Sequence, residues 1–257
     1  LRPGEEENER GMAVLYSYRD GQIVRSVETE LSEHPSRIRR ITTGKLQDDV
    51  PAVFVTSSSG DNTIVTDIFA VKDGEFTNVS FSTEADTSIG TLLNYYVYAE
   101  DIDADGILEL PGLITMKPVG SWREDEQKFL LRWYSLDSEG WELDKMYTFH
   151  NYLGGWYLQL DGAWASRLTV EQEHGCYSFY VWDESYQMAT PLFTLYVFTS
   201  VDRDELASQN GRFPLYRSEG VAYAAQLDIA APEYDITEKS LQDSFHLIRQ
   251  DWQTGET

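Results

Sequence analysis

Residues 100–110 read Glu-Asp-Ile-Asp-Ala-Asp-Gly-Ile-Leu-Glu-Leu, and they contain the strongest structural signal in the chain. Three aspartates, Asp101, Asp103 and Asp105, alternate with other residues before a glycine, and Glu109 follows. Carboxylates placed this densely repel one another unless a cation lies between them. The run therefore predicts a cation-binding loop.

The backbone of this loop is expected to turn tightly at Gly106, because glycine adopts conformations closed to other residues. The carboxylates then converge, and the Ile107 carbonyl and Glu109 complete an oxygen cage that suits Ca²⁺. An EF-hand is excluded, because its bidentate acid stands at loop position 12, which is Gly112 here. The alternative is an ordinary turn, in which aspartate side chains bond their own backbone. The predicted ligands of a structural Ca²⁺ are Asp101, Asp103, Asp105, Ile107 and Glu109.

The loop joins two segments with the composition of β-strands, residues 94–99 before it and residues 107–116 after it. A loop of this kind between two strands resembles the calcium-binding hairpin of FG-GAP, or integrin-type, β-propeller repeats. Those repeats have the pattern D-x-D-x-D-G-x-x-D, and Glu109 stands in place of its last aspartate. The resemblance implies a Ca²⁺ loop within a blade of antiparallel strands.

Three further segments share a strand–turn–strand pattern, at residues 14–24, 68–76 and 131–141. The first two contain Asp-Gly, which two-residue β-hairpin turns favour because both positions need positive φ. The third is a slightly longer hairpin that contains Gly140. Residues 43–55 align with the calcium loop but lack its alternating aspartates. The spacing of these hairpins is typical of blade-sized repeats with variable loops.

These repeats predict a first domain over residues 1–150 with about two and a half blades, whereas closed propellers typically have at least four. The repeats at residues 37–83 and 92–150 are each expected to have four strands, and residues 11–30 supply two more. Three explanations stay open: a fragment of a longer protein, an open stack of sheets, or chains that complete one another. The start at Leu1 rather than methionine favours a truncated or processed product.

Residues 151–257 are expected to form a second domain of mixed α+β structure. The pattern Gly-Trp-Tyr-Leu-Gln-Leu, followed by Trp164, resembles the opening hairpin of PsbP-type α+β domains. The spacing of Leu241, Phe245 and Trp252 predicts a C-terminal helix. Strands are expected at residues 156–160, 167–170, 176–182, 192–200 and 221–226, and helices at residues 202–209 and 237–252.

The expected fold class is mainly β, with incomplete β-propeller-like antiparallel blades over residues 1–150. A small α+β domain with a C-terminal helix follows over residues 151–257. This order of domains resembles secreted bacterial lipoproteins in which propeller-like repeats precede a small α+β module. The resemblance implies an extracellular or cell-surface location, as a lipoprotein ectodomain. Ca²⁺ sites of this open type bind at about 10⁻⁴–10⁻³ M, as in extracellular modules, which favours the same location.

The formal net charge of −24 argues against several classes of partner. A surface this acidic repels nucleic-acid phosphates and anionic membranes, so nucleic-acid binding is excluded. No apolar run is long enough to span a bilayer, so direct membrane insertion by this chain is not expected. The single cysteine, Cys176, allows no intramolecular disulfide. Hydrophobic residues at 41% and aromatic residues at 13% indicate globular, sheet-rich domains.

No catalytic residue and no organic cofactor are predicted. The four histidines, His34, His150, His174 and His246, lack the spacing of a zinc site. No Gly-x-Ser-x-Gly nucleophile motif occurs. The 44 acidic residues make a pair of carboxylates inevitable by chance, so they do not by themselves indicate glycoside hydrolysis. Trp122, in a polar segment, is the best candidate for an exposed aromatic contact.

The acidic loop and the hairpin repeats together predict an extracytoplasmic binding or scaffold module that a structural Ca²⁺ stabilises. Its partner is an unidentified protein, peptide or glycan. Two alternatives stay open. One is a glycan-active hydrolase with its cleft between the two domains, and the other is a purely structural spacer associated with the cell wall.

Overall fold

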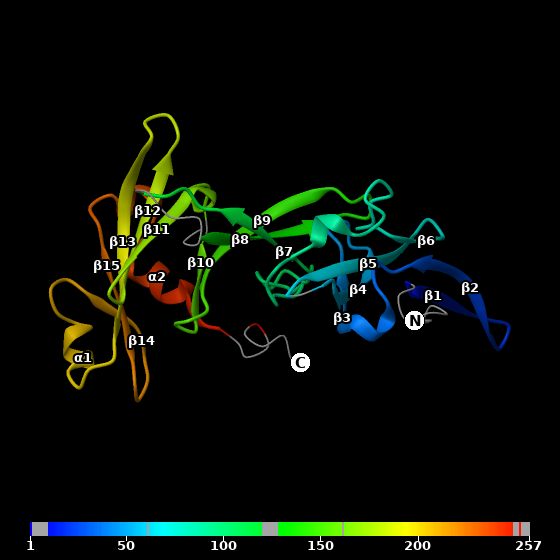
Figure 1. Cartoon of the computed structure of the whole chain (residues 1–257), viewed down its shortest axis with the longest axis horizontal. Coiled ribbons are helices and arrows are strands. Elements are labelled where there is room, and N and C mark those ends of the chain that lie inside the picture. Colours follow the sequence, from blue (N-terminus) through cyan, green and yellow to red (C-terminus); the bar gives the residue numbers. More distant parts are fainter. Residues whose placement is uncertain (2–9, 61, 120–127, 161, 249–251, 253–257) are drawn as a thin grey trace. The chain divides into compact units, whose positions relative to one another are not determined.

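The computed structural model describes residues 1, 10–60, 62–119, 128–160, 162–248 and 252. This part of the chain is mainly β, with antiparallel sheets and short helices (Figure 1), which confirms the mainly β fold class. Across the described residues, no helix has the length and apolar character needed to cross a membrane.

The strands are β1 Met12–Arg19, β2 Gln22–Glu30, β3 Ile38–Lys45, β4 Pro51–Ser58, β5 Ile64–Lys72, β6 Glu75–Asn78, β7 Leu110–Thr115, β8 Phe129–Leu136, β9 Glu142–Asn151, β10 Trp156–Leu160, β11 Leu168–Glu173, β12 Cys176–Asp183, β13 Met188–Phe198, β14 Phe213–Arg217, β15 Ala222–Leu227 and β16 Phe245–Leu247. The α-helices are α1 Arg203–Leu206 and α2 Glu238–Ser244, and the 3₁₀-helices are η1 Pro35–Arg37, η2 Ile89–Thr91, η4 Ala165–Arg167 and η5 Ala231–Tyr234.

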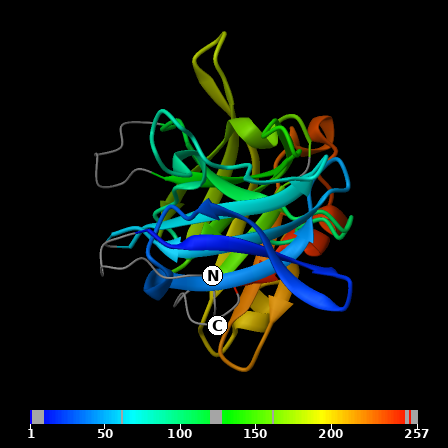
Figure 2. The same ribbon diagram turned by 90° about the vertical axis from the view of Figure 1, so that its right-hand side faces the viewer.

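The first large sheet is an antiparallel meander in the order β3-β4-β5-β6. Its strands run side by side in Figure 2, where they are coloured from blue to cyan. The sheet lies within residues 37–83, where the sequence predicts one four-stranded repeat. Seven successive residues of β5 are buried, which is typical of an inner strand covered on both faces.

The hairpins form where the Asp-Gly pairs predict them. Strands β1 and β2 are joined by Asp20 and Gly21, with φ of 50° and 81°. Strands β5 and β6 are joined by Asp73 and Gly74, with φ of 51° and 85°. Positive φ at both turn positions is the geometry that the right-handed twist of paired strands requires. The turn between β8 and β9 contains Gly140, also at a positive φ of 85°.

The second predicted repeat, residues 92–150, has three strands, β7, β8 and β9, in place of the expected four. Residues 94–99 form no strand, although Tyr98 among them is buried. A single bridge between Glu100 and Glu109 follows this segment. The expectation of a strand at residues 94–99 was wrong, because buried apolar side chains can pack in a core without a strand ladder.

The described chain divides into two compact units, each of which consists of several segments. The expected single boundary between residues 150 and 151 does not coincide with this division, because β7, β8 and β9 each contribute residues to both units. Unit 1 consists of Leu1–Gly112, Trp133–Lys145 and Arg249–Thr257, and unit 2 consists of Leu113–Arg132 and Met146–Ile248. Unit 1 has a core that includes Leu46, Phe54, Ile68, Leu110 and Tyr134.

Unit 2 contains the sheet β11-β12-β13-β15-β14 and a larger core with Trp156, Phe179 and Phe193. The expected C-terminal helix at residues 237–252 is shorter in the structure, since α2 ends at Ser244. The three residues after it form β16, which pairs antiparallel with β10. A strand that the sequence does not predict, β14, pairs with β15 at the edge of the sheet.

Candidate metal site

The candidate site is the loop that precedes strand β7 in unit 1. Its ends are held together because Glu100 N donates to the Glu109 carbonyl at 3.0 Å and Glu109 N donates to the Glu100 carbonyl at 2.8 Å. Leu108 N donates to the Lys45 carbonyl of β3 at 3.1 Å. The Leu108 side chain lies over Gly44, where an added Cβ would come within 2.4 Å of it. The loop is therefore fixed to β3 as well as closed at its base.

Within the loop, the aspartate side chains accept hydrogen bonds from the backbone. Asp101 accepts from Asp105 N at 2.9 Å and from Gly106 N at 3.0 Å. Ala104 and Gly106 have positive φ of 61° and 89°, and the glycine reaches this conformation without strain. Ile107 N donates to the Asp105 carboxylate at 2.9 Å. These bonds form the tight turn that the sequence predicts, and they are also the bonds of an ordinary aspartate turn.

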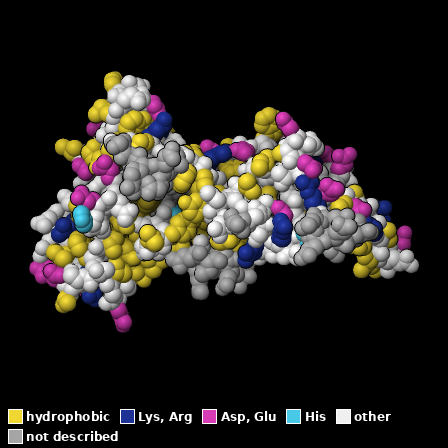
Figure 3. Space-filling model, in the orientation of Figure 1, with side chains coloured by type: hydrophobic (Ala, Val, Ile, Leu, Met, Phe, Trp, Pro, Cys, Tyr) yellow, Lys and Arg dark blue, Asp and Glu magenta, His cyan; other side chains and the backbone are white. Residues whose placement is uncertain are grey.

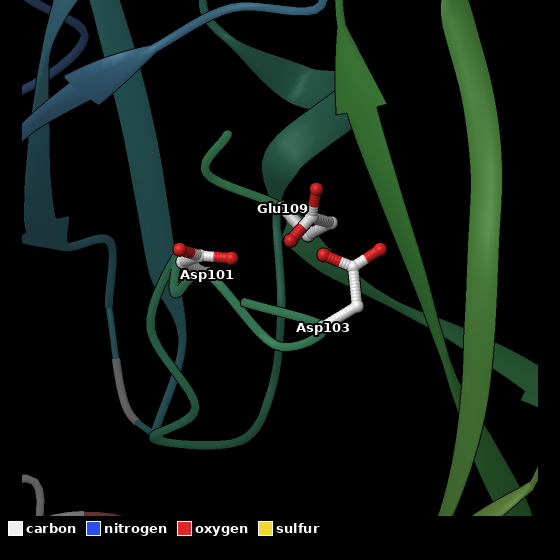
Figure 4. A group of neighbouring side chains, drawn as sticks. All are labelled: Asp101, Asp103 and Glu109. Carbon is white, nitrogen blue, oxygen red and sulfur yellow. The ribbon is translucent and has the colours of Figure 1, made fainter. Parts of the chain in front are cut away.

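Three of the predicted ligand side chains lie together. Asp101, Asp103 and Glu109 each offer a carboxylate oxygen, and these oxygens lie within 4.8 Å of one another. Figure 4 shows the three carboxylates converging from the two arms of the loop. Asp103 is exposed, Asp101 is half-buried and Glu109 is buried, so the group is open to solvent on one side.

The Glu109 carboxylate is the unusual member of this group, because its side chain is fully buried with 0% exposed. One oxygen accepts a hydrogen bond from Ile102 N at 3.1 Å. The other, Oε1, has no hydrogen-bond partner among the described residues. Burial raises the pKa of Glu109 to about 7, and the nearby Asp103 and Asp105 add to this rise, while the Ile102 hydrogen bond and Lys145 oppose it. Burying a charge without a partner costs free energy of folding, so a bound cation or a proton on this carboxylate would stabilise the folded protein.

Asp105 has a different partner. Its carboxylate accepts a hydrogen bond from Lys145 Nζ at 2.5 Å, and Lys145 comes from β9 of the same unit. This bond holds the pKa of Asp105 below its usual value and raises the pKa of Lys145. The structure thus brings Asp101, Asp103 and Glu109 together, and it places Asp105 on the Lys145 ammonium. The Ile107 carbonyl stays a predicted ligand.

A second polar cluster surrounds Asp67 in the middle of β5, and the sequence does not reveal it. The Asp67 side chain is buried with 0% exposed. It accepts hydrogen bonds from Ser32 N at 2.8 Å, Ser32 Oγ at 2.7 Å, Asn78 Nδ2 at 2.8 Å and Ser88 Oγ at 2.6 Å. Four neutral donors satisfy this carboxylate, so its role is structural. The only hint of this cluster in the sequence is a single acidic residue within an apolar strand.

The tryptophans also bear on possible contacts. Trp122 lies outside the described residues, so its predicted exposure stays a prediction. Trp133, Trp156 and Trp252 are buried. Trp141, in the β8–β9 hairpin, is 76% exposed and is the most accessible of the described tryptophans.

The acidic residues are spread over the surface. Figure 3 shows Asp and Glu side chains scattered over the visible face, with Lys and Arg side chains among them. Several acids pair with neighbouring cations, such as Glu139 with Lys72 at 2.5 Å. The net charge of −24 therefore suits a solvated surface and by itself marks no binding site.

Comparison with known proteins adds no family to these observations. No protein-family model matches the chain, and no significantly similar protein was found among curated proteins or among solved structures.

Proposed function

We propose that the loop from Asp101 to Glu109 binds Ca²⁺, and that this ion stabilises an extracytoplasmic binding or scaffold module. The observation that supports the proposal is the buried Glu109 carboxylate, which has one oxygen without a hydrogen-bond partner among the described residues and lies in a cluster with the carboxylates of Asp101 and Asp103. A divalent ion neutralises such a group, and oxygen-only ligands favour Ca²⁺ over softer metals. The open side of the site leaves room for water ligands.

The competing explanation is that Lys145 is the counter-charge of the loop. Its ammonium already pairs with Asp105, and its pKa is raised by Asp105 first and then by Asp103 and Glu109. A single ammonium does not neutralise four carboxylates, however, and Glu109 Oε1 makes no hydrogen bond within the described part of the chain. Lys145 pairs with Asp105, whereas the proposed ion would bind the cluster that contains Glu109. Variants of Lys145 and of the cluster can therefore distinguish the two explanations.

Ca²⁺ added to chelator-treated protein is expected to bind saturably, and Asp103→Asn should weaken this binding at least tenfold. The reason is that Asp103 contributes its carboxylate to the cluster, and one charged ligand is worth about 1.4 kcal/mol or more at such a site. Isothermal titration calorimetry measures both affinities. Asp20→Asn is the matched control, since it removes one exposed carboxylate at a turn where asparagine is equally favoured.

The variant Lys145→Met separates the two explanations. If Ca²⁺ binds, removal of the ammonium frees Asp105, and the affinity should stay the same or rise. If Lys145 alone balances the loop, wild-type protein shows no saturable heat at millimolar Ca²⁺, and Lys145→Met lowers the melting temperature. That second pair of results would reduce the loop to an aspartate turn.

Affinity for Ca²⁺ should fall about tenfold between pH 8 and pH 6, because a proton competes with the ion at Glu109. The pKa of Glu109 is about 7, so this carboxylate is mostly ionised at the higher pH and mostly protonated at the lower. Titrations at the two pH values in buffers of different ionisation heat also measure the proton that Ca²⁺ releases. An affinity that does not change over this range would remove Glu109 from the ligand set.

An extracellular or cell-surface location, as in a lipoprotein ectodomain, belongs to the same proposal. An exposed, partly solvated loop of this kind binds Ca²⁺ at about 10⁻⁴–10⁻³ M, which is the range of extracellular modules. The four-stranded meander, with its Asp73-Gly74 hairpin, supports a blade-like scaffold of the FG-GAP type. The ion then has a structural role, and partner binding is assigned to other surfaces of the chain.

A further inference from the structure

We propose that a pocket in unit 2 binds a neutral saccharide, such as one pyranose ring of a glycan. The pocket has a volume of about 500 Å³ and lies between β10, η4, η5 and α2. Every residue that lines it belongs to unit 2, so the site is complete within one compact body. This volume is within the range of small-molecule sites. The saccharide would be the ligand of the proposed binding role, so its assignment rests on that role, although it does not depend on the Ca²⁺ loop.

The pocket has an aromatic wall made by Trp164 and Tyr234. Their rings pack edge to face, with centroids 6.4 Å apart and planes at 76°. Gly162 lies against the Trp164 indole, since a Cβ there would come within 3.0 Å of Nε1. Leu160 and Leu241, both buried in the core of unit 2, also line the pocket. Two amphipathic rings fixed in this way offer an apolar surface that remains open to a ligand.

The rim of the pocket supplies polar side chains with unused bonding capacity. The side chains of Arg167, Glu233 and Asp235 make no hydrogen bond or ion pair with any other described residue. The side-chain oxygen of Gln159 is hydrogen-bonded to His246 Nε2 at 3.1 Å. The side-chain NH₂ group of Gln159 makes no hydrogen bond to a described residue. The rim therefore offers guanidinium and amide donors beside two carboxylate acceptors.

The mixture of charges on this rim decides between classes of small ligand. Glu233 and Asp235 repel an anion, and Arg167 repels a cation. A purely apolar ligand would desolvate all three without replacing their bonds to water. A neutral ring with hydroxyl groups gives hydrogens to the carboxylates and accepts from the guanidinium. Its apolar C–H face meanwhile packs on Trp164. A saccharide, with its hydroxyl groups and its apolar ring face, meets all of these requirements.

Saturation-transfer NMR with the full chain and a panel of neutral sugars tests the assignment. The panel consists of glucose, galactose, N-acetylglucosamine, cellobiose, maltose and lactose, and glucuronate is titrated beside it as the charged comparison. At least one should show saturable transfer to its ring C–H protons, with a Kd of about 1–10 mM for a monosaccharide. Trp164→Ala should weaken that binding at least tenfold, because the ring loses its stacking surface.

Two further variants test whether weaker binding can be separated from loss of the folded structure. Arg167→Ala and Glu233→Gln change exposed rim residues, so each should weaken binding severalfold without a change in melting temperature. Trp141→Ala, in unit 1, is the control that should leave binding unchanged. Absence of saturable transfer across the panel would overturn the inference, and so would unchanged binding by both rim variants or stronger binding of glucuronate. Repeating the titration with and without Ca²⁺ separates failure of this site from failure of the metal loop.

Discussion

Replacing Glu109 with glutamine is expected to abolish Ca²⁺ binding and, at the same time, to stabilise the metal-free protein at pH 8. Glutamine keeps the shape of the side chain and removes its charge. The loss of the only buried carboxylate of the cluster should reduce Ca²⁺ affinity by about a hundredfold or more. The gain in metal-free stability has a separate cause, which is the burial of a charge without a partner.

The sign of this stability change follows from the pKa of Glu109, which burial raises to about 7 from an ordinary value of 4.5. The folded protein keeps the Glu109 proton up to about pH 7, while the unfolded chain loses it near pH 4.5. Metal-free stability therefore falls as the pH rises between these two values. Above pH 7 the cost is about 1–3 kcal/mol, and Glu109→Gln should recover it.

Chemical denaturation of both proteins at pH 8, in chelator and then in excess Ca²⁺, measures the two effects together. Wild type should gain about 1.4 kcal/mol at a tenfold excess of Ca²⁺ over its Kd, whereas the variant should gain nothing. Glu75→Gln, an exposed acid on β6, serves as the control. A variant that is less stable than wild type in chelator, yet still responds to Ca²⁺, would contradict both the burial argument and the site.

Replacing Asp67 with alanine is expected to lower the free energy of unfolding by about 3–5 kcal/mol. The change deprives the backbone and hydroxyl of Ser32, the amide of Asn78 and the hydroxyl of Ser88 of their shared acceptor. Donors left buried without a partner each cost about 1–3 kcal/mol. Urea denaturation gives the difference directly.

Two comparisons make the Asp67 result specific. Asp67→Asn keeps one carbonyl acceptor in place and should cost less than alanine, because part of the network survives. Glu75→Ala, on the neighbouring strand β6 and exposed, should change stability by less than about 0.5 kcal/mol. Equal stability of Asp67→Ala and wild type would mean that the four hydrogen bonds add no net stability.

The features that sequence predicts well are those that local chemistry determines. Asp20-Gly21 and Asp73-Gly74 specify their turns because few other dipeptides accept positive φ twice. The tight acidic loop is also determined locally, because its hydrogen bonds join residues only two to five positions apart.

The features that sequence misses depend on residues far apart in the chain. The C-terminal helix stops at Ser244 because Phe245 and the two residues after it bond to β10, a strand that lies far earlier in the sequence. Lys145 reaches Asp105 of the loop from strand β9, and no spacing pattern indicates this pair. The sequence gives no reason for an aspartate at position 67 of an apolar strand, because the donors that satisfy its carboxylate come from three separate segments of the chain.

The strand order also sets a sequence of events in folding. In the β3-β4-β5-β6 meander every strand pairs with its neighbour in the chain, so little loop entropy is lost before contacts form. Strand β16 instead pairs Leu247 with Trp156, across almost the whole of unit 2. This three-residue edge strand should be the last to dock during folding and the first to open in the native state, so its amide protons should exchange with solvent earlier than those of β5.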